Sequence, residues 1–222
     1  MSDKKRWLIF AAILLAGLAA LPAAGRADMG PAIRGNGDIV SQERQAQGFA
    51  TVELEGAGNL RIHPGDEHRV VVTTDGNLQE LVTTRVKGSA LVIRSERINP
   101  SRLTIDVYLP DLRGVSLSGA GSASVGAFAA DAFGVSMAGS WRVAFAGGSA
   151  DSLRVSIAGS GRVDMEDFRA GAVSVRISGS GNVRTWAEDS LHVSISGSGT
   201  VAHRGSPAIS FNRAGAGRIR RI

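Results

Sequence analysis

A nine-residue phrase recurs in this chain, as VSIAGSGRV at residues 155–163 and as VSISGSGTV at residues 193–201. Aligned on its glycines, the phrase occurs in tandem with starts 20, 20, 20, 18 and 18 residues apart, at Val115, Val135, Val155, Val175, Val193 and Phe211. An outlying copy begins at Val52. A unit this short cannot bury its own apolar face, so it becomes stable only when neighbouring units stack. The repeat therefore restricts the fold to stacked-repeat architectures.

Apolar and small polar residues alternate within each copy. The phrase from Val155 places Val155 and Ile157 on one side and Ser156 on the other, and Val163 resumes the alternation after the glycines. A period of two with one apolar side is typical of a half-buried β-strand and not of a helix.

Glycine-rich corners join these strands. Gly-Ser-Gly or Gly-Ala-Gly bends the chain sharply and lets the next unit pass close by, because glycine adopts positive φ at little cost. We therefore predict an all-β fold, a right-handed parallel β-helix or closely related β-solenoid with rungs of 18 to 20 residues. A left-handed β-helix needs a hexapeptide period, which is absent from this sequence, and a propeller repeats at about 40 residues.

Residues 1–27 differ in kind from the rest of the chain. Basic residues precede an apolar run at 7–21, and small residues follow it, which is the layout of a secretory signal peptide. An uncleaved membrane anchor is the alternative, but the run is short for the ~20 residues that a spanning helix needs. We therefore expect export and no transmembrane segment after signal cleavage.

The remaining chain divides by regularity. Residues 28–47 are polar, and we expect a poorly ordered segment there; residues 48–222 are expected to form a single β-solenoid domain. Within it, residues 48–111 predict irregular coils broken by hairpins, and residues 112–222 predict regular rungs. Arg213 replaces an expected apolar residue near the end, which predicts a cap against open-ended stacking.

Net charge gives no support to nucleic-acid binding. Without residues 1–27 the chain keeps 21 basic and 19 acidic residues, so it is close to neutral. Local positive charge remains in RAGAGRIRRI at the C-terminus, which is either a solvated end or a surface that attracts acidic lipid headgroups or polysaccharide.

The repeated glycines do not predict a cofactor or metal site. A phosphate loop needs a following helix and a lysine, whereas strand follows strand here and Lys87 is the only lysine after residue 27. A calcium roll would need carboxylates in each rung, but only Asp164 follows its turn. The chain has no cysteine, and its histidines share no ligand spacing. We expect no catalytic, cofactor-binding or metal-binding residues.

Polysaccharide cleavage is the enzyme alternative, by a lyase or hydrolase. Glycosidic hydrolysis needs two carboxylates within about 5 to 9.5 Å. Asp131 and Asp151 would be stacked one rung apart, and Asp164, Glu166 and Asp167 lie together in the sequence. The other interpretation makes the first two turn formers and the last three a solvated edge.

A flat outer face is the candidate binding surface. One outward column recurs in successive rungs, namely Ser116, Ser136, Ser156, Arg176 and Ser194. Trp141 and Trp186 could stack on sugars if they are exposed, or could fill the core or seal an edge.

Three stretches in this order carry a family resemblance: GDEHRVVVTTDGNLQELVTTRVKGSALVIRS, then LTIDVYLPDLRGVSLSGAGS, then successive GSG-x-V units. Residues 48–218 resemble the putative autotransporter adhesin, head-GIN domain family, a domain of unknown function. The resemblance implies a secreted or envelope-attached bacterial β-helix-like protein and brings no catalytic residues with it.

Together these observations predict an exported, non-enzymatic protein of the bacterial periplasm or outer surface that works as an adhesin-like binding or display scaffold. Its expected partner is an envelope glycan or another envelope protein, and not a nucleic acid. A polysaccharide-active enzyme and a periplasmic protein-interaction module remain the alternatives.

Overall fold

The computed structural model describes residues 31–95 and 97–222. The signal peptide expected at 1–27 lies outside this part of the chain. Residues from Ile33 to Ile222 form one compact unit. Its elements are β1 (Ile33–Arg34), β2 (Ile39–Arg44), β3 (Thr51–Pro64), β4 (Arg69–Asp75), the 3-10 helix η1 (Gly76–Leu81), β5 (Thr83–Lys87), β6 (Ala90–Ser95), β7 (Ile98–Asn99), β8 (Leu103–Leu109), β9 (Gly114–Val125), β10 (Phe128–Phe145), β11 (Gly148–Gly159), β12 (Arg162–Gly179), β13 (Asn182–Gly197), β14 (Thr200–Arg204), β15 (Ala208–Gly215) and β16 (Arg218–Arg221).

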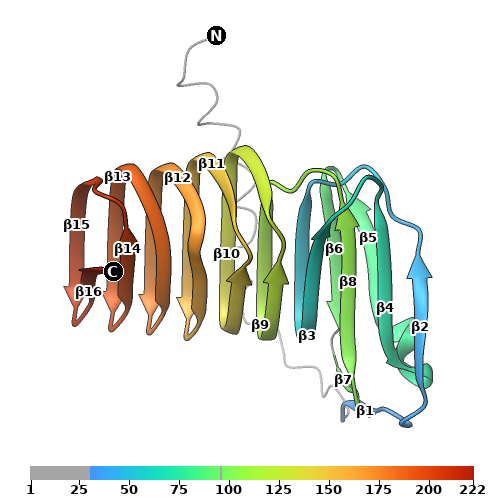
Figure 1. The fold of residues 1–222 in the computed structure, drawn as a ribbon. Coiled ribbons are helices and arrows are strands. Elements are labelled where there is room, and N and C mark those ends of the chain that lie inside the picture. Colours follow the sequence, from blue (N-terminus) through green and yellow to red (C-terminus); the bar gives the residue numbers. More distant parts are fainter. Residues whose placement is uncertain (1–30, 96) are drawn as a thin grey trace. The chain divides into compact units, whose positions relative to one another are not determined.

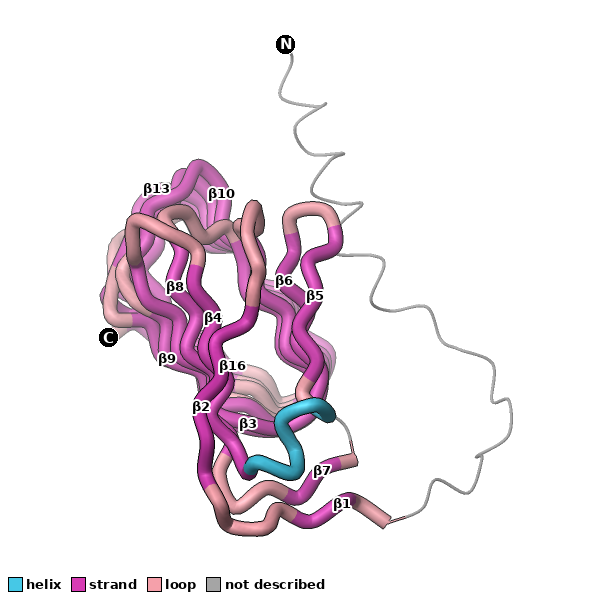
Figure 2. Tube along the Cα trace, turned by 90° about the vertical axis from the view of Figure 1, so that its right-hand side faces the viewer, coloured by secondary structure: helices cyan, strands magenta, loops and turns pink. Residues whose placement is uncertain are grey.

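The repeat region is a parallel β-solenoid, as predicted. Strands β9 to β13 follow one another in sheet order, each pairing in parallel with the next. Figure 1 shows these rungs side by side, and the view from the end in Figure 2 shows their strands superimposed around a common core. In the part of the chain that the structure describes, no helix is long and apolar enough to cross a membrane.

The apolar columns expected from the repeat line the interior. Val135, Val155 and Val175 are partners in successive rungs, and each is at most 1% exposed. A second column of Met137, Ile157 and Ile177 behaves in the same way. Like side chains thus stack one rung apart and bury each other, which is how a repeat protein builds a continuous core.

The first glycine of each corner forms a stack that we call the glycine ladder, made of Gly119, Gly139, Gly159, Gly179, Gly197 and Gly215. All six have φ between +101° and +127°. A Cβ atom on Gly159 would run into the carbonyl oxygen of Gly139 one rung earlier, and each other member meets the glycine before it in the same way, beginning with Gly56. Only a residue without Cβ fits this approach at this backbone angle.

The second glycine of the corner leaves room inside the rung. A Cβ on Gly181 would meet Ile157 and Ile177 at 3.0 to 3.1 Å, and Gly217 faces Ile195 similarly. Trp141 occupies this position in its own rung and is 2% exposed. Its indole lies against Gly121 of the preceding rung, where a side chain would meet the ring at 2.7 Å. Trp141 is therefore a core residue, one of the two roles considered from the sequence.

The shortening of the rung from 20 to 18 residues occurs at one edge of β12 and β13. Met165 pairs with Thr185, but the next pairs are Arg169 with Trp186 and Ala172 with Ser190. The earlier, longer rungs hold Phe168 inside, where its ring contacts Phe133 and Phe145 at centroid distances of 5.3 and 5.9 Å. The rung that follows has no phenylalanine, and Ala187 is buried in its stretch after Trp186.

The N-terminal part mixes parallel and antiparallel pairs. Strand β3 continues the solenoid by pairing in parallel with β9, β8 and β6. Strands β5 and β6 form an antiparallel hairpin, and β4 lies antiparallel to both β8 and β2. The N-terminal part therefore has a different pairing pattern from the parallel rungs that follow.

Residues 39–44, in the segment expected to be poorly ordered, form β2 instead. The physical reason is a distant anchor, Asp75, which is fully buried. Its carboxylate accepts hydrogen bonds from the backbone N–H of Gly37 at 2.6 Å and of Ser101 at 2.8 Å. Burial alone raises the pKa of the Asp75 carboxyl group, but these hydrogen bonds outweigh it and hold the pKa below its ordinary value.

Replacing Gly159 with alanine should destabilise the protein by about 3 kcal/mol, because positive φ and the approach of the Gly139 carbonyl both penalise a Cβ atom. Chemical denaturation measures this change. Gly88→Ala is the matched control, since Gly88 has φ +59° with nothing near its Cβ position, and it should cost only about 1 kcal/mol. Equal losses for the two variants would show that the close approach between rungs does not matter.

Asp75→Asn should lower the free energy of unfolding at neutral pH and have a shrinking effect in acid. Because the folded-state pKa is lowered, the carboxylate stabilises the protein fully above the unfolded value of about 4, and this contribution is lost as the pH falls through the folded-state pKa. Unfolding measured from pH 7 to pH 2 for both proteins tests this, with the exposed Asp66→Asn as a control for net charge. A deficit that stays constant over this range would contradict the account.

Candidate functional site

The outward residues predicted as a binding face form a straight row across the rungs, which we call the serine column: Ser116, Ser136, Ser156, Arg176 and Ser194. Each is the register partner of the next on neighbouring strands. The four serines are half-buried, and Arg176 is exposed. The outward positions on one side of the column are small, as in Ala138, Ala158 and Ser178, whereas those on the other side include Arg154 and His192. Four of the five positions therefore offer a hydroxyl, and successive positions are spaced by about 4.8 Å.

One charged group lies within this row, and another lies just beyond its N-terminal end. Glu53 of β3 pairs with Ser116 and extends the column on the N-terminal side. Burial of Glu53, and then the negative charge of Glu55, raise the pKa of its carboxyl group, while Lys87 opposes the shift. Arg176 stands near the other end, and it has no ion-pair partner among residues 31–95 and 97–222. The guanidinium is free to bind an anionic group.

Trp186 belongs to another part of the surface. It is a register partner of Arg169 and Arg204, and not of the serine column. The Arg169 guanidinium lies 4.3 Å from the centroid of the indole ring, and that of Arg204 lies 5.8 Å away. Cations at this distance are attracted to the face of an aromatic ring. The half-buried indole of Trp186 is thus already in contact with arginines. Because Trp141 lies in the core, neither tryptophan belongs to the candidate face, which consists of the serine column alone.

The carboxylates of Asp164, Glu166 and Asp167 are held in ion pairs. Arg184 donates to Glu166 at 2.6 Å, and Arg204 contacts Glu166 at 2.7 Å and Asp167 at 3.0 Å. Asp164 lies 3.7 Å from Arg184. These arginines come from the two following rungs, which the sequence did not link to the acidic cluster. The pairing favours the interpretation as a charged edge rather than as a pair of catalytic acids.

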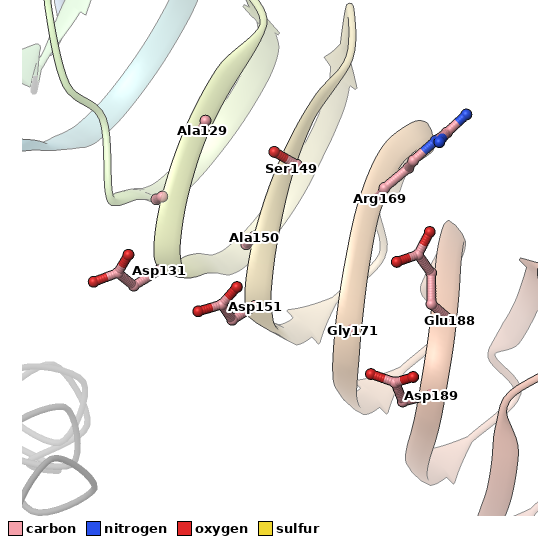
Figure 3. Close-up of a pocket in the computed structure, with 10 residues that line it drawn as sticks. Ala129, Asp131, Ser149, Ala150, Asp151, Arg169, Gly171, Glu188 and Asp189 are labelled. Carbon is pink, nitrogen blue, oxygen red and sulfur yellow. The ribbon is translucent and has the colours of Figure 1, made fainter.

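Asp131 and Asp151 project from adjacent rungs into a shallow, open hollow, as Figure 3 shows. Their neighbours Ala130 and Ala150 are register partners. In the next rung the position is Gly171, and Asp189 then follows, with its carboxylate 3.0 Å from where a Gly171 Cβ would be. The sequence correctly aligned these residues, and the hollow that they line is open to solvent.

The histidines are dispersed in the structure. His63 contacts the Asp106 carboxylate at 3.2 Å and stacks on Tyr108, and His68 bonds the carbonyl of Phe49. His203 is buried at 4% exposure. Among the described residues, no group of three or more histidine, aspartate or glutamate side chains could hold a metal ion.

Comparison with solved structures shows the same fold in several bacterial proteins. A putative adhesin from Bacteroides fragilis is 20% identical with a TM-score of 0.68, and covers 86% of this chain and 100% of its own. A putative adhesin from Parabacteroides distasonis is 17% identical with a TM-score of 0.57, over 86% and 99% of the two chains. One from Parabacteroides merdae is 16% identical with a TM-score of 0.56, over 87% and 100%. No curated protein matches.

A family model matches residues 48–207, which is most of the chain. This span includes β3 to β14, the glycine ladder up to Gly197, and the entire serine column. The match agrees with the resemblance carried by the three sequence stretches. The chain belongs to the family described as putative auto-transporter adhesin, head GIN domain.

Proposed function

We propose that this protein is an exported, non-enzymatic component of the bacterial envelope that binds or displays through the serine column. The observation that carries the proposal is the combination of a flat row of hydroxyls with one free guanidinium at Arg176. A flat, evenly spaced face suits an extended ligand that contacts several rungs at once. Family membership and the adhesin neighbours support this class of function.

The chemistry of the face favours a glycan of the envelope as the ligand, with another envelope protein as the second choice. Serine hydroxyls both donate and accept hydrogen bonds, as sugar hydroxyls do. Arg176 adds a charge-assisted contact that fits a carboxylate or a phosphate on the ligand. The short side chains on one side of the column, Ala138, Ala158 and Ser178, allow a polymer to approach the backbone there. The signal-like layout of residues 1–27 supports export to the periplasm or outer surface.

Arg176→Glu should leave folding unchanged but weaken retention on envelope preparations by about tenfold, because a charge-assisted hydrogen bond becomes a repulsion. Binding of the purified protein to isolated envelopes and to acidic envelope glycans measures this. The matched control is Arg162→Glu, which makes the same charge change at an exposed position outside the serine column. Equal retention of wild-type and Arg176→Glu protein would contradict the proposed face.

The proposal also makes a prediction about turnover. Incubation with a panel of acidic polysaccharides should release no new chain ends, because the carboxylates that line the hollow are exposed to solvent, and those of Glu166 and Asp167 are already paired with arginines. Reducing-end assays and absorbance of unsaturated products cover hydrolase and lyase activity, respectively. Release of product that Asp151→Asn abolishes would instead support the enzyme alternative.

A further inference from the structure

The large apolar side chains that are exposed in the described chain lie at the two ends of the solenoid. Those at the N-terminal end are Ile33, Ile39, Val40, Leu81 and Val86, and those at the C-terminal end are Ile209, Phe211 and Ile222. The rungs between them bury their large apolar residues. The solenoid core is therefore uncovered where the stacking stops, and the C-terminal end shows this most clearly because every residue of β15 is exposed.

We call β15 and β16 the C-terminal rung. Strand β15 pairs only with β13, and β16 pairs only with β14, among the described strands. The opposite edge of each strand keeps unpaired backbone N–H and C=O groups. Such an edge is a template for another strand, and proteins usually protect it.

The inward positions of the C-terminal rung are of two kinds. Ile209 and Phe211 are in register with the buried Leu191 and Val193, so they continue the apolar columns. Arg213 takes the position that follows Ile195.

On the other side of the rung, Ile219 follows Val201, and Arg221 follows His203. The inward positions of this end thus hold apolar side chains together with two arginines.

Within the described residues 31–95 and 97–222, neither Arg213 nor Arg221 forms an ion pair with an aspartate or glutamate. The sequence after Asp189 contains five arginines and no aspartate or glutamate. Arg204 pairs back to Glu166 and Asp167. Arg213 donates to the carbonyl of Gly217 at 3.4 Å, and Arg221 donates to the hydroxyl of Ser206 at 3.1 Å. Both contacts are with neutral acceptors, so the positive charge of the end stays uncompensated.

We propose that the C-terminal rung binds an extended, acidic segment of another polypeptide, which adds to β15 as a further strand. Apolar residues of the segment would cover Ile209 and Phe211, and a carboxylate two residues further on would meet Arg213. The free edge supplies the backbone hydrogen bonds, and the arginines select the sign of charge. This inference is independent of the serine column, which runs along the side of the solenoid.

The charges argue against a second copy of the chain as the occupant. Two C-terminal rungs facing each other would bring together arginines from both copies without a carboxylate between them, which is unfavourable for facing strands. The edge strand β5 at the other end carries Arg85 and Lys87. Glu43 of β2 is already paired with Arg69 at 3.0 Å. Neither edge complements the C-terminal rung.

The test uses synthetic peptides that copy residues 190–199, the stretch of β13 on which β15 is stacked. One peptide carries the change Ile195→Glu and the other carries Ile195→Lys. Titration into the isotope-labelled protein, followed by NMR, should show the Glu peptide binding about fivefold more tightly, because one pairing attracts Arg213 and the other repels it. Amide shifts should be confined to β13 to β16.

The protein variant Arg213→Glu should reverse this preference, and Arg162→Glu should leave it unchanged. Arg213→Gln should abolish the preference. This neutral variant provides a second test if the Arg213→Glu protein fails to fold. Equal affinity for both peptides, or amide shifts outside β13 to β16, would overturn the proposal. So would self-association that Arg213→Glu abolishes, or binding to phosphatidylglycerol vesicles without binding to either peptide. The peptide preference does not depend on Arg176, so Arg176→Glu should not change it. Failure of the serine-column proposal can therefore be distinguished from failure of this one.

Discussion

The approach of one glycine to the carbonyl oxygen of the glycine a rung earlier is the contact on which this fold depends. Along the glycine ladder, from Gly119 to Gly215, positive φ turns the chain and the missing Cβ lets the backbones meet. Because each corner repeats this contact, each strand begins in register with the strand before it. The valine and isoleucine columns then stack without adjustment, as the pairing of Val135, Val155 and Val175 shows. The glycine corner sets the register in which the apolar core packs, and the packed core in turn stabilises the corner.

A solenoid of this kind presents two kinds of surface, its side and its ends. Its side is repetitive, so a contact made in one rung can be made again in the next, and the serine column is the clearest instance. Its ends are unique, because only there does the core stop. Some charged side chains near the surface are paired with one another, as with the Glu166 carboxylate between Arg184 and Arg204. Exposed ion pairs of this sort contribute little individually, but they fix which charges remain available.

Much of this architecture could be predicted from the sequence, because aligning the repeats on their glycines also gives the residue pairs of neighbouring strands. The alternation around Ser156 identifies the strand, its buried side and its neighbours in one step, and the parallel stacking is confirmed. The N-terminal part has no such internal guide. Strand β2 depends on Asp75, which lies more than thirty residues away and is held by backbone groups that no local pattern reveals.

The candidate site was harder to predict for a similar reason. The sequence placed the serine column correctly in register, but it left Trp141 open between the surface and the core. That choice depends on Gly121 in the preceding rung, which makes room for the indole. The pairing of Glu166 with arginines of later rungs likewise depends on how the shortened rung aligns β12 with β13. These are properties of stacking between rungs, and they appear only when the rungs are placed together.

The most direct test of the account measures the stacking itself. The chain has no cysteine, so cysteines introduced in place of Ser116 and Ser194 can carry spin labels at unique positions on the serine column. The two positions are separated by four rung steps, so the account predicts a narrow distance distribution with a backbone separation of about 19 Å along the stack. A broad distribution, or one centred well beyond about 30 Å after allowance for the labels, would contradict a continuous column of rungs in register.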